Sequence, residues 1–315
     1  MSWYALASYK RADRVLPALV LEGQLYDLQQ LCAALKPASE STQKLISTGV
    51  GGIITRWGQA EPAIAELAAA AEQARVTGNL TPALGAAKNH PDLALPFVPS
   101  QVFAAASNYI EHANEMGTVL AAKSNSKPYM FIKATSSVVG PGENVVIPSQ
   151  VSRPDWEVEL GVVIGRSGRR IDVEASMDYV AGYTVINDVS ARDQTRREDY
   201  PFKFDWFQGK CFDTFAPIGP WFVPRACIAD PQTLKLGLDV NGEPMQNGSA
   251  KEMIWNIKEQ ISYLSSLLTL QPGNLIATGT PTGVGMGRGI FLKPGDSMRA
   301  WVENIGEIHS PVIAE

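Results

Sequence analysis

The sequence predicts an α+β protein that is mainly β, with a small N-terminal α/β domain at residues 1–95 and a larger domain at residues 96–315. Short apolar runs separated by Pro and Gly turns recur through the second part of the chain and indicate a sheet-rich core. Turn-forming residues gather at residues 89–92 and at Pro96, where the character of the chain changes. We therefore expect a connector there, with the domain boundary near residue 95.

The N-terminal domain is expected to contain strands followed by helices. Residues 3–28 have short apolar runs broken by turn residues, which is typical of strands joined in a hairpin. The Ala-rich segment at residues 61–75 favours a helix, with Pro62 tolerated in its first turn. A small sheet accompanied by helices is the expected result.

The larger domain is expected to be a β-rich or barrel-like core with one helix packed against it. Apolar residues recur at three- and four-residue steps from Ile254 through Ile261 to Leu268 and indicate that helix. The core strands are expected at residues 145–148, 157–164, 180–186, 234–240, 275–278 and 297–302.

The composition is that of a globular protein and excludes several classes of function. The 315 residues are 45% hydrophobic and 19% charged, with a formal net charge of -5, so we expect no nucleic-acid partner. The three cysteines lack CxxC spacing, which fits a reducing compartment. Charged residues near the N-terminus interrupt any secretory signal, and no run approaches the ~20 apolar residues of a membrane span. A cytoplasmic protein without a membrane partner is expected.

Two carboxylates on one predicted strand are the first candidates for chemistry. Side chains alternate along a strand, so Glu157 and Glu159 project from one face while Val158 and Leu160 project from the other. Two like charges in one small space repel, and one would protonate unless a cation lies between them. The alternative is a strand whose carboxylates face solvent, and these residues alone leave both interpretations open.

A third carboxylate favours a metal site. The apolar run at residues 180–186 is followed by Asn187 and Asp188, so Asp188 reaches the same place if the two strands are neighbours. Three oxygen ligands with no Cys and no clustered His select Mg²⁺, Mn²⁺ or Ca²⁺ rather than zinc. Since Mg²⁺ keeps water or takes substrate oxygens at its other positions, such a site suits a chelating substrate.

A series of short blocks runs in order from Asn108 toward the C-terminus, over roughly two thirds of the chain. The blocks are Asn108-Tyr109 with His112 and Glu115, Phe131-Ile132-Lys133, Glu157-Val158-Glu159-Leu160, residues 187–193, residues 209–214, Val240-Asn241-Gly242-Glu243 and residues 278–285. In order and spacing these blocks resemble the catalytic domain of the fumarylacetoacetate hydrolase family. The resemblance implies that family's mixed β-sandwich roll or barrel, and the N-terminal domain resembles the smaller domain of longer members.

This resemblance implies roles for individual residues. Glu157, Glu159 and Asp188 correspond to the metal ligands of the family. His112 and Glu115 correspond to its catalytic dyad, in which Glu115 orients the imidazole of His112 from the same face of a short helix. Without the surrounding match, a His followed by a Glu at this spacing is an ordinary surface pair.

Lys210 corresponds to a lysine near the metal that contacts the substrate or the developing negative charge. The alternative is a surface lysine lying over neighbouring phenylalanines. His90 and His309 lack a partner of the dyad kind and are interpreted as structural. Further substrate contacts are expected from Tyr109, Lys133, Arg192 and Thr280, the last in a Gly-Thr-Pro-Thr-Gly turn that can present donors to an oxyanion.

For activity, the resemblance implies a hydrolase that depends on Mg²⁺ or Mn²⁺ and forms a homodimer. The expected substrate is an acylpyruvate or related 2,4-diketo acid, such as the fumarylpyruvate, maleylpyruvate or fumarylacetoacetate of aromatic-compound catabolism. A carbon–carbon bond would be cleaved after His112 deprotonates the attacking water, and Lys210 would stabilise the oxyanion.

Other reactions use the same enolate chemistry and remain open: decarboxylation of an oxaloacetate-type acid, isomerisation of a 2-hydroxymuconate type of acid, and hydration of a 2-keto-4-enoate. A metal-binding module without turnover is a further alternative, although the complete set of site residues argues against it. The aromatic segment at residues 200–207 is expected to line either the pocket or a dimer contact, since aromatic residues are enriched in both.

Overall fold

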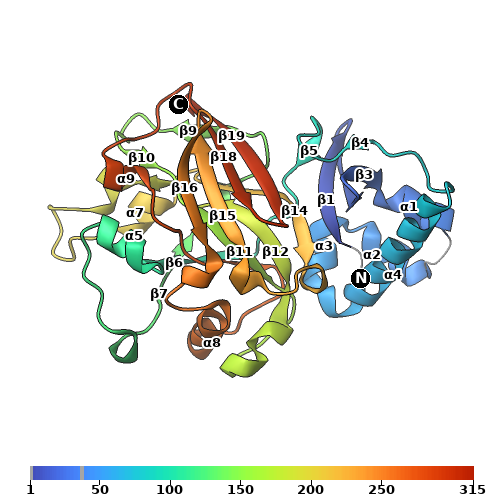
Figure 1. Ribbon diagram of the computed structural model, residues 1–315, viewed down its shortest axis with the longest axis horizontal. Coiled ribbons are helices and arrows are strands. Elements are labelled where there is room, and N and C mark those ends of the chain that lie inside the picture. The colour runs from blue at the N-terminus through green and yellow to red at the C-terminus, as the bar shows by residue number, and fades with distance from the viewer. Residues whose placement is uncertain (1–2, 36–38) are drawn as a thin grey trace.

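A 12-stranded sheet forms the centre of the computed structural model, which describes residues 3–35 and 39–315 (Figure 1). Its order is β4-β3-β2-β1-β14-β12-β11-β17-β6-β7, with β5 beside β1 and β8 beside β14. The strand pairs are antiparallel except β17 with β6 and β14 with β8. The strands are β1 (Tyr4–Arg11), β2 (Arg14–Leu21), β3 (Gln24–Asp27), β4 (Gly85–Ala86), β5 (Leu93–Ala94), β6 (Gln101–Ala106), β7 (Tyr129–Lys133), β8 (Val138–Val139), β11 (Val158–Ile164), β12 (Val180–Asn187), β14 (Ala216–Pro224) and β17 (Asn274–Ala277).

A 5-stranded sheet packs against the large one and completes a sandwich. Leu160 and Val185 of the large sheet share one buried apolar cluster with Leu238 and Ile308 of the small sheet. Within the described residues both sheets keep free edges, so the mainly β sandwich is confirmed but the barrel-like alternative is not what forms. The small sheet contains β16 (Glu243–Ser249), β15 (Lys235–Val240), β18 (Ser297–Val302), β19 (Gly306–Ala314) and β9 (Val145–Ile147), and β10 (Pro154–Asp155) pairs separately with β13 (Ser190–Ala191).

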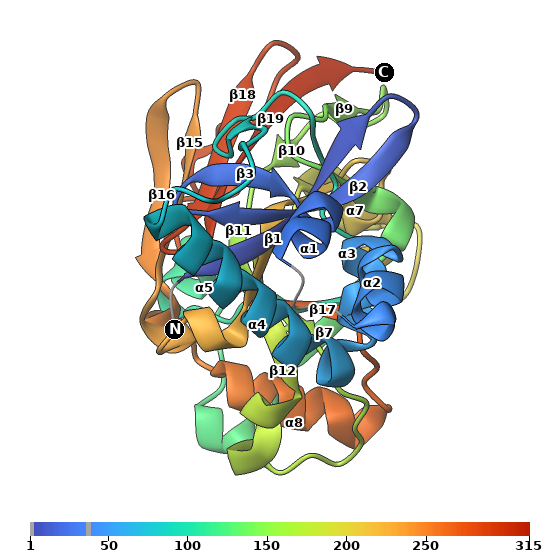
Figure 2. The same cartoon turned by 90° about the vertical axis from the view of Figure 1, so that its right-hand side faces the viewer.

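The N-terminal strands divide their side chains between two cores. In β1, Ala5 and Ala7 belong to the sandwich cluster, whereas Tyr4 and Leu6 belong to a second cluster on the opposite face. This alternation follows from the two-residue period of a strand. The second face is covered by α1 (Leu28–Leu35), α2 (Glu40–Ile46), α3 (Gly49–Thr55) and α4 (Trp57–Val76), which Figure 2 shows gathered beside β1 and β3.

The helix predicted at residues 61–75 is longer than expected. It begins at Trp57, so Pro62 lies inside the helix and its predicted place in the first turn is wrong. Packing explains the earlier start, because the Trp57 ring is 4% exposed and lies 5.0 Å from the ring of Phe222. Burial of an aromatic side chain of this size outweighs a backbone hydrogen bond lost at proline.

The other predicted elements are found with their ends shifted by no more than three residues. The amphipathic helix is α8 (Ile257–Leu267), which starts three residues after Ile254 because Asn256 and Glu259 form a capping box there. The remaining helices are α5 (Ile110–Glu115), α6 (Arg192–Thr195), α7 (Trp206–Lys210) and α9 (Gly285–Arg288), with 3₁₀ turns η1 (Lys123–Asn125), η2 (Thr135–Ser137), η3 (Val173–Tyr179), η4 (Arg225–Cys227), η5 (Pro231–Thr233) and η6 (Ala250–Glu252).

Contacts between the two parts of the chain are extensive. One edge of β1 pairs with β2, and the other edge pairs with β14 and with β5, so the large sheet continues across residue 95. The division into domains at that residue therefore stays a prediction.

The three cysteines are free, as expected. Among the described helices, none combines the length and the apolar character needed to span a bilayer.

His309 has a partner that the sequence analysis did not anticipate. Its Nε2 lies 3.1 Å from Oε1 of Glu307, a residue that also pairs with Lys88 and Arg299. Residues two apart on a strand point to the same face, and both lie on β19. This pairing differs from the dyad, because Glu307 precedes the histidine by two residues on a strand, and the interpretation of His309 as structural stays a prediction.

Candidate metal centre and active site

Three buried carboxylates converge where β11 begins and β12 ends. The two strands are antiparallel, with Val158 opposite Asn187, so Glu157 and Asp188 are neighbours across the pair. The Asp188 N–H donates to the Glu157 carbonyl at 2.8 Å. Glu159 lies two residues along β11 on the same face. One oxygen from each of the three carboxylates lies within 4.8 Å of the others.

Two buried lysines neutralise part of this negative charge. Lys210, the last residue of α7, places Nζ 2.5 Å from Glu157 Oε2 and 2.7 Å from Asp188 Oδ2. Lys133, at the end of β7, places Nζ 2.6 Å from Asp188 Oδ1. Burial works against the charge of Lys210, but Asp188 and Glu157 outweigh it and raise the pKa of that ammonium. Lys210 is therefore not a surface lysine.

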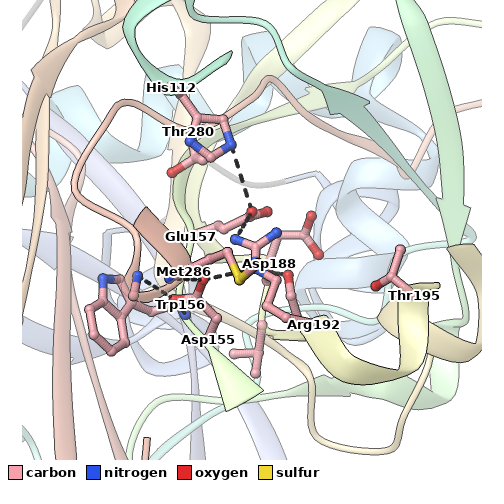
Figure 3. Close-up of polar contacts among 12 residues, drawn as sticks. His112, Asp155, Trp156, Glu157, Asp188, Arg192, Thr195, Thr280 and Met286 are labelled. Carbon is pink, nitrogen blue, oxygen red and sulfur yellow. Dashed lines mark hydrogen bonds and ion pairs between the residues drawn. The ribbon is translucent and has the colours of Figure 1, made fainter. Parts of the chain in front are cut away.

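Arg192 lies between Glu157 and a further buried carboxylate, Asp155. The guanidinium of Arg192 donates to Glu157 Oε1 at 2.5 Å and to Asp155 Oδ2 at 2.8 Å. Burial alone would raise the pKa of Glu157, but Arg192 and Lys210 lower it well below the ordinary value. Figure 3 shows Glu157 between His112 and Arg192.

Glu159 lacks such compensation. Its Oε2 accepts a hydrogen bond from Gly279 N–H at 2.7 Å, and in residues 3–35 and 39–315 no Lys, Arg or His forms an ion pair with it. Burial, followed by the charges of Asp188 and Glu157, raises its pKa well above the ordinary value. A divalent cation would remove this conflict. Three carboxylates in one buried space are a donor set that fits Mg²⁺ or Mn²⁺.

The predicted dyad faces the carboxylates from α5. Nδ1 of His112 lies 3.3 Å from Glu115 Oε2, and Nε2 lies 3.9 Å from Glu157 Oε1. Burial favours a neutral Glu115, but hydrogen bonds from His112 and from the Gly283 N–H outweigh it and lower its pKa. Glu115 is thus held as a carboxylate that can orient the imidazole.

Gly283 must be glycine for this contact to form. Its φ is +103°, a conformation that L side chains rarely adopt. A Cβ at this position would lie 2.0 Å from the Met245 carbonyl oxygen. The glycine-rich turn after β17 therefore brings a backbone N–H to Glu115 where a larger residue would be excluded.

Two important residues escaped the sequence analysis. Asp155 accepts hydrogen bonds from the Gly285 and Met286 N–H groups at 2.6 and 2.9 Å, besides its pair with Arg192. Gln246 donates to Thr280 Oγ1 and accepts from the Val158 N–H. The position of Asp155 beside the Glu157 motif was the available signal. Nothing in the sequence near Gln246 indicated its partners, which lie 34 and 88 residues away.

The remaining predicted contacts lie close to the centre but are engaged differently. Thr280 donates its hydroxyl to the Val158 carbonyl, which holds the turn onto β11. Tyr109 caps α5 at its N-terminus, is 2% exposed, and has an Oη without a partner in the described structure. Lys133 also donates to the Val189 and Lys210 carbonyls. Substrate contacts by Tyr109, Lys133, Arg192 and Thr280 stay predictions.

Replacing Lys210 with Met is expected to destabilise the metal-free protein by about 3–5 kcal/mol, because two buried carboxylates lose the cation between them. Urea unfolding in EDTA measures this loss, and Mg²⁺ should recover more stability in the variant than in the wild type. Lys235→Met, at an exposed lysine of β15, is the matched control. Equal urea midpoints for Lys210→Met and the control would contradict this role of Lys210.

Comparisons with known proteins agree with this geometry. The model of the family "Fumarylacetoacetate (FAA) hydrolase C-terminal" matches residues 101–313. Fumarylacetoacetate hydrolase from Exiguobacterium antarcticum is similar over 99% of this chain and 100% of its own, with TM-score 0.76 and 28% identity. Maleylpyruvate hydrolase from Sphingobium sp. SYK-6 is similar over the same shares, with TM-score 0.71 and 27% identity.

A third solved structure bears the name of a different reaction. The 5-carboxymethyl-2-hydroxymuconate delta-isomerase from Mycobacterium smegmatis is similar over 71% of this chain and 80% of its own, with TM-score 0.61 and 32% identity. The family match covers more than half of the chain and contains all the carboxylates and the dyad described above. The chain belongs to the fumarylacetoacetate hydrolase family.

Proposed function

We propose that this protein is a divalent-metal-dependent hydrolase that cleaves a carbon–carbon bond in an acylpyruvate or related 2,4-diketo acid. The observation that carries the proposal is the approach of the His112–Glu115 pair to within 3.9 Å of a buried carboxylate cluster. A positioned base beside a cation site suits a reaction that needs both an activated water and a stabilised enolate. The similarity to maleylpyruvate hydrolase supports this choice of substrate class, and aromatic-compound catabolism is the proposed setting.

Glu157, Glu159 and Asp188 would hold the cation, with Mg²⁺ or Mn²⁺ preferred and Ca²⁺ as a further candidate. When bound, the cation would supply Lewis-acid stabilisation of the negative charge that develops on the departing pyruvate. Lys210 and Lys133 offset the negative charge of Asp188 and Glu157, so the centre is not left with three uncompensated carboxylates.

The steps assigned to protein side chains follow from the contacts. Nε2 of His112 takes a proton from water while Glu115 holds Nδ1. The water oxygen forms a bond to the distal carbonyl carbon, and the carbon–carbon bond then breaks with its electron pair passing to the pyruvate fragment. A proton from the imidazolium completes that fragment. Lys210 would donate to the oxyanion, and removing such a donor typically costs ~10²–10³ in rate.

An isomerase of the 2-hydroxymuconate type is the second candidate, favoured by the similarity to the M. smegmatis enzyme. It would use His112 to move a proton between carbons instead of activating water. Decarboxylation of an oxaloacetate-type acid and hydration of a 2-keto-4-enoate would also need a cation that stabilises an enolate. A cytoplasmic location also stays a prediction.

Turnover of acetylpyruvate, maleylpyruvate, fumarylpyruvate, fumarylacetoacetate and oxaloacetate tests the proposal directly. With Mg²⁺ or Mn²⁺ we expect loss of diketone absorbance and release of one pyruvate per acylpyruvate consumed. EDTA should abolish turnover, as should Glu159→Gln, whereas Glu66→Gln on the exposed face of α4 should retain it. Release of CO₂ from oxaloacetate alone would move the assignment to a decarboxylase.

Replacing His112 with Gln is expected to lower kcat by about 10²–10⁴, since general-base catalysis contributes roughly that much. Glu115→Gln should lower kcat less and should leave KM nearly unchanged. Because the pKa of Glu115 is lowered, its carboxylate is ionised at neutral pH, so the activity lost in Glu115→Gln at neutral pH measures what the charged partner of His112 contributes.

The matched control for both substitutions is Glu111→Gln, an exposed residue on the same helix. It should retain wild-type turnover. Wild-type activity in His112→Gln would remove His112 from the mechanism and would favour the module without turnover.

We further propose a homodimer that uses the aromatic segment at residues 200–207. Tyr200, Phe202, Phe204 and Phe207 are between 51% and 78% exposed. An exposed cluster of large apolar side chains is typical of an interaction site. The segment leads directly into α7, which carries Lys210, so an interface here would support the centre.

Sedimentation velocity is expected to show a dimer for the wild type and a monomer for the double substitution Phe202→Ser with Phe207→Ser, because the apolar contact area is lost. Val76→Ser, at another exposed apolar residue, should leave the dimer intact. A dimer that persists in the double variant would place the interface elsewhere.

A further inference from the structure

A groove of about 610 Å³ lies beside α5 and the loop that follows it. In Figure 1 this loop extends away from the sandwich between α5 and β7. None of the cluster carboxylates, neither member of the dyad and neither buried lysine lines the groove. Its lining includes Ile110 and Ala113 of α5, Lys127 of the loop, and the aromatic residues Tyr129, Trp206 and Trp255.

The groove and the proposed active site lie on opposite faces of α5. Successive residues of a helix are rotated by about 100°, so Ile110, Ala113 and Asn114 form one face. His112 and Glu115 form the opposite face and point to the carboxylates. The groove is therefore a separate cavity behind the helix that carries the dyad.

The chemistry of the lining indicates what would bind there. Tyr129, Trp206 and Trp255 supply aromatic surface, and Ile110 and Ile254 add aliphatic surface. Two lysines line the groove and no acidic side chain does. Lys123 is already paired with Glu259 at 2.8 Å and lies 4.9 Å over the Trp255 ring.

Lys127 differs from Lys123. In the part of the chain that the structure describes, its ammonium forms no ion pair and no hydrogen bond. An apolar, aromatic cavity with an uncompensated cation on its rim complements an apolar molecule that carries one negative charge.

We propose that this groove is a second small-molecule site, which takes an aromatic or other apolar monocarboxylate. The apolar body of the ligand lies against Trp206 and Trp255, and the carboxylate faces Lys127. This site does not depend on the proposed reaction, because it uses none of the residues of the carboxylate centre.

Occupancy of the groove would affect the dyad through α5. The ligand would contact Ile110 and Ala113, which lie on the same six-residue helix as His112. A ligand that binds more tightly when α5 has the position seen in this structure stabilises that position. It thereby also stabilises His112 beside Glu157. Binding in the groove and order in the dyad are therefore coupled.

The probe pair 3-phenylpropionate and 3-phenylpropan-1-ol tests the site in the full chain with EDTA present. Calorimetry should show saturable binding of the acid, with a dissociation constant on the order of 1 mM for a ligand of this size. Lys127→Gln should weaken the acid about fivefold and leave the alcohol unchanged, as expected for one partly exposed charge pair. Lys235→Gln, at an exposed lysine of β15, should change neither.

Two further measurements locate the probe. His112→Gln removes no direct contact with the acid, because the dyad lies on the other face of α5, so only the coupling through the helix should change its affinity, by about twofold. Hydrogen exchange of the amides at residues 110–115 should slow when the probe is bound, because ligand contacts oppose local opening. Trp206→Ala, once shown by circular dichroism to be folded, should weaken acid and alcohol alike.

Several outcomes would overturn the proposal. One is the absence of saturable binding by the acid. Another is equal affinity in Lys127→Gln and Lys235→Gln. Loss of binding in His112→Gln would place the probe on the dyad side of the helix, and unchanged exchange at residues 110–115 would remove it from the groove. None of these results bears on whether the protein hydrolyses a diketo acid, so the two proposals fail separately.

Discussion

Burial of three carboxylates within 4.8 Å of one another is the constraint on which the rest of the centre depends. Like charges at this distance repel strongly in a medium of low dielectric constant. The surrounding residues respond to that repulsion: Lys210 and Lys133 compensate Glu157 and Asp188, and Arg192 adds a further charge at Glu157. Among the described residues no Lys, Arg or His pairs with Glu159, which makes the cluster suitable for a divalent ion.

The sandwich provides the rigid support that such a cluster requires. β11 and β12 are flanked by β17 and β14 within the large sheet, and the small sheet covers one face. Charged groups held by packed strands cannot move apart to relieve repulsion, so their charges must be balanced where they stand. The glycine-rich turn after β17 approaches closely enough for its N–H groups to bind Glu159 and Glu115.

Much of this arrangement could be predicted from local sequence. The two-residue period of a strand placed Glu157 and Glu159 on one face, and helical spacing placed His112 beside Glu115, as the distances confirm. Asp155 could not be assigned in this way, because its backbone donors lie 130 residues further along the chain. Pro62 was misplaced for a similar reason, since the packing of Trp57 on Phe222 decides where α4 begins. Local sequence patterns predict which segments form helices and strands and which side chains share a face. Contacts between distant segments decide where a helix begins and which residues support the carboxylates.

The contact between Glu115 and Gly283 joins residues 168 positions apart. The ribosome synthesises α5, which carries His112, long before it synthesises the turn that orients the dyad. The centre can therefore assemble only after most of the chain has been synthesised, and the partly made protein holds its acidic residues without their final partners. Because contacts of such long sequence separation form slowly, the nascent chain passes through a period in which the dyad is present but not yet positioned.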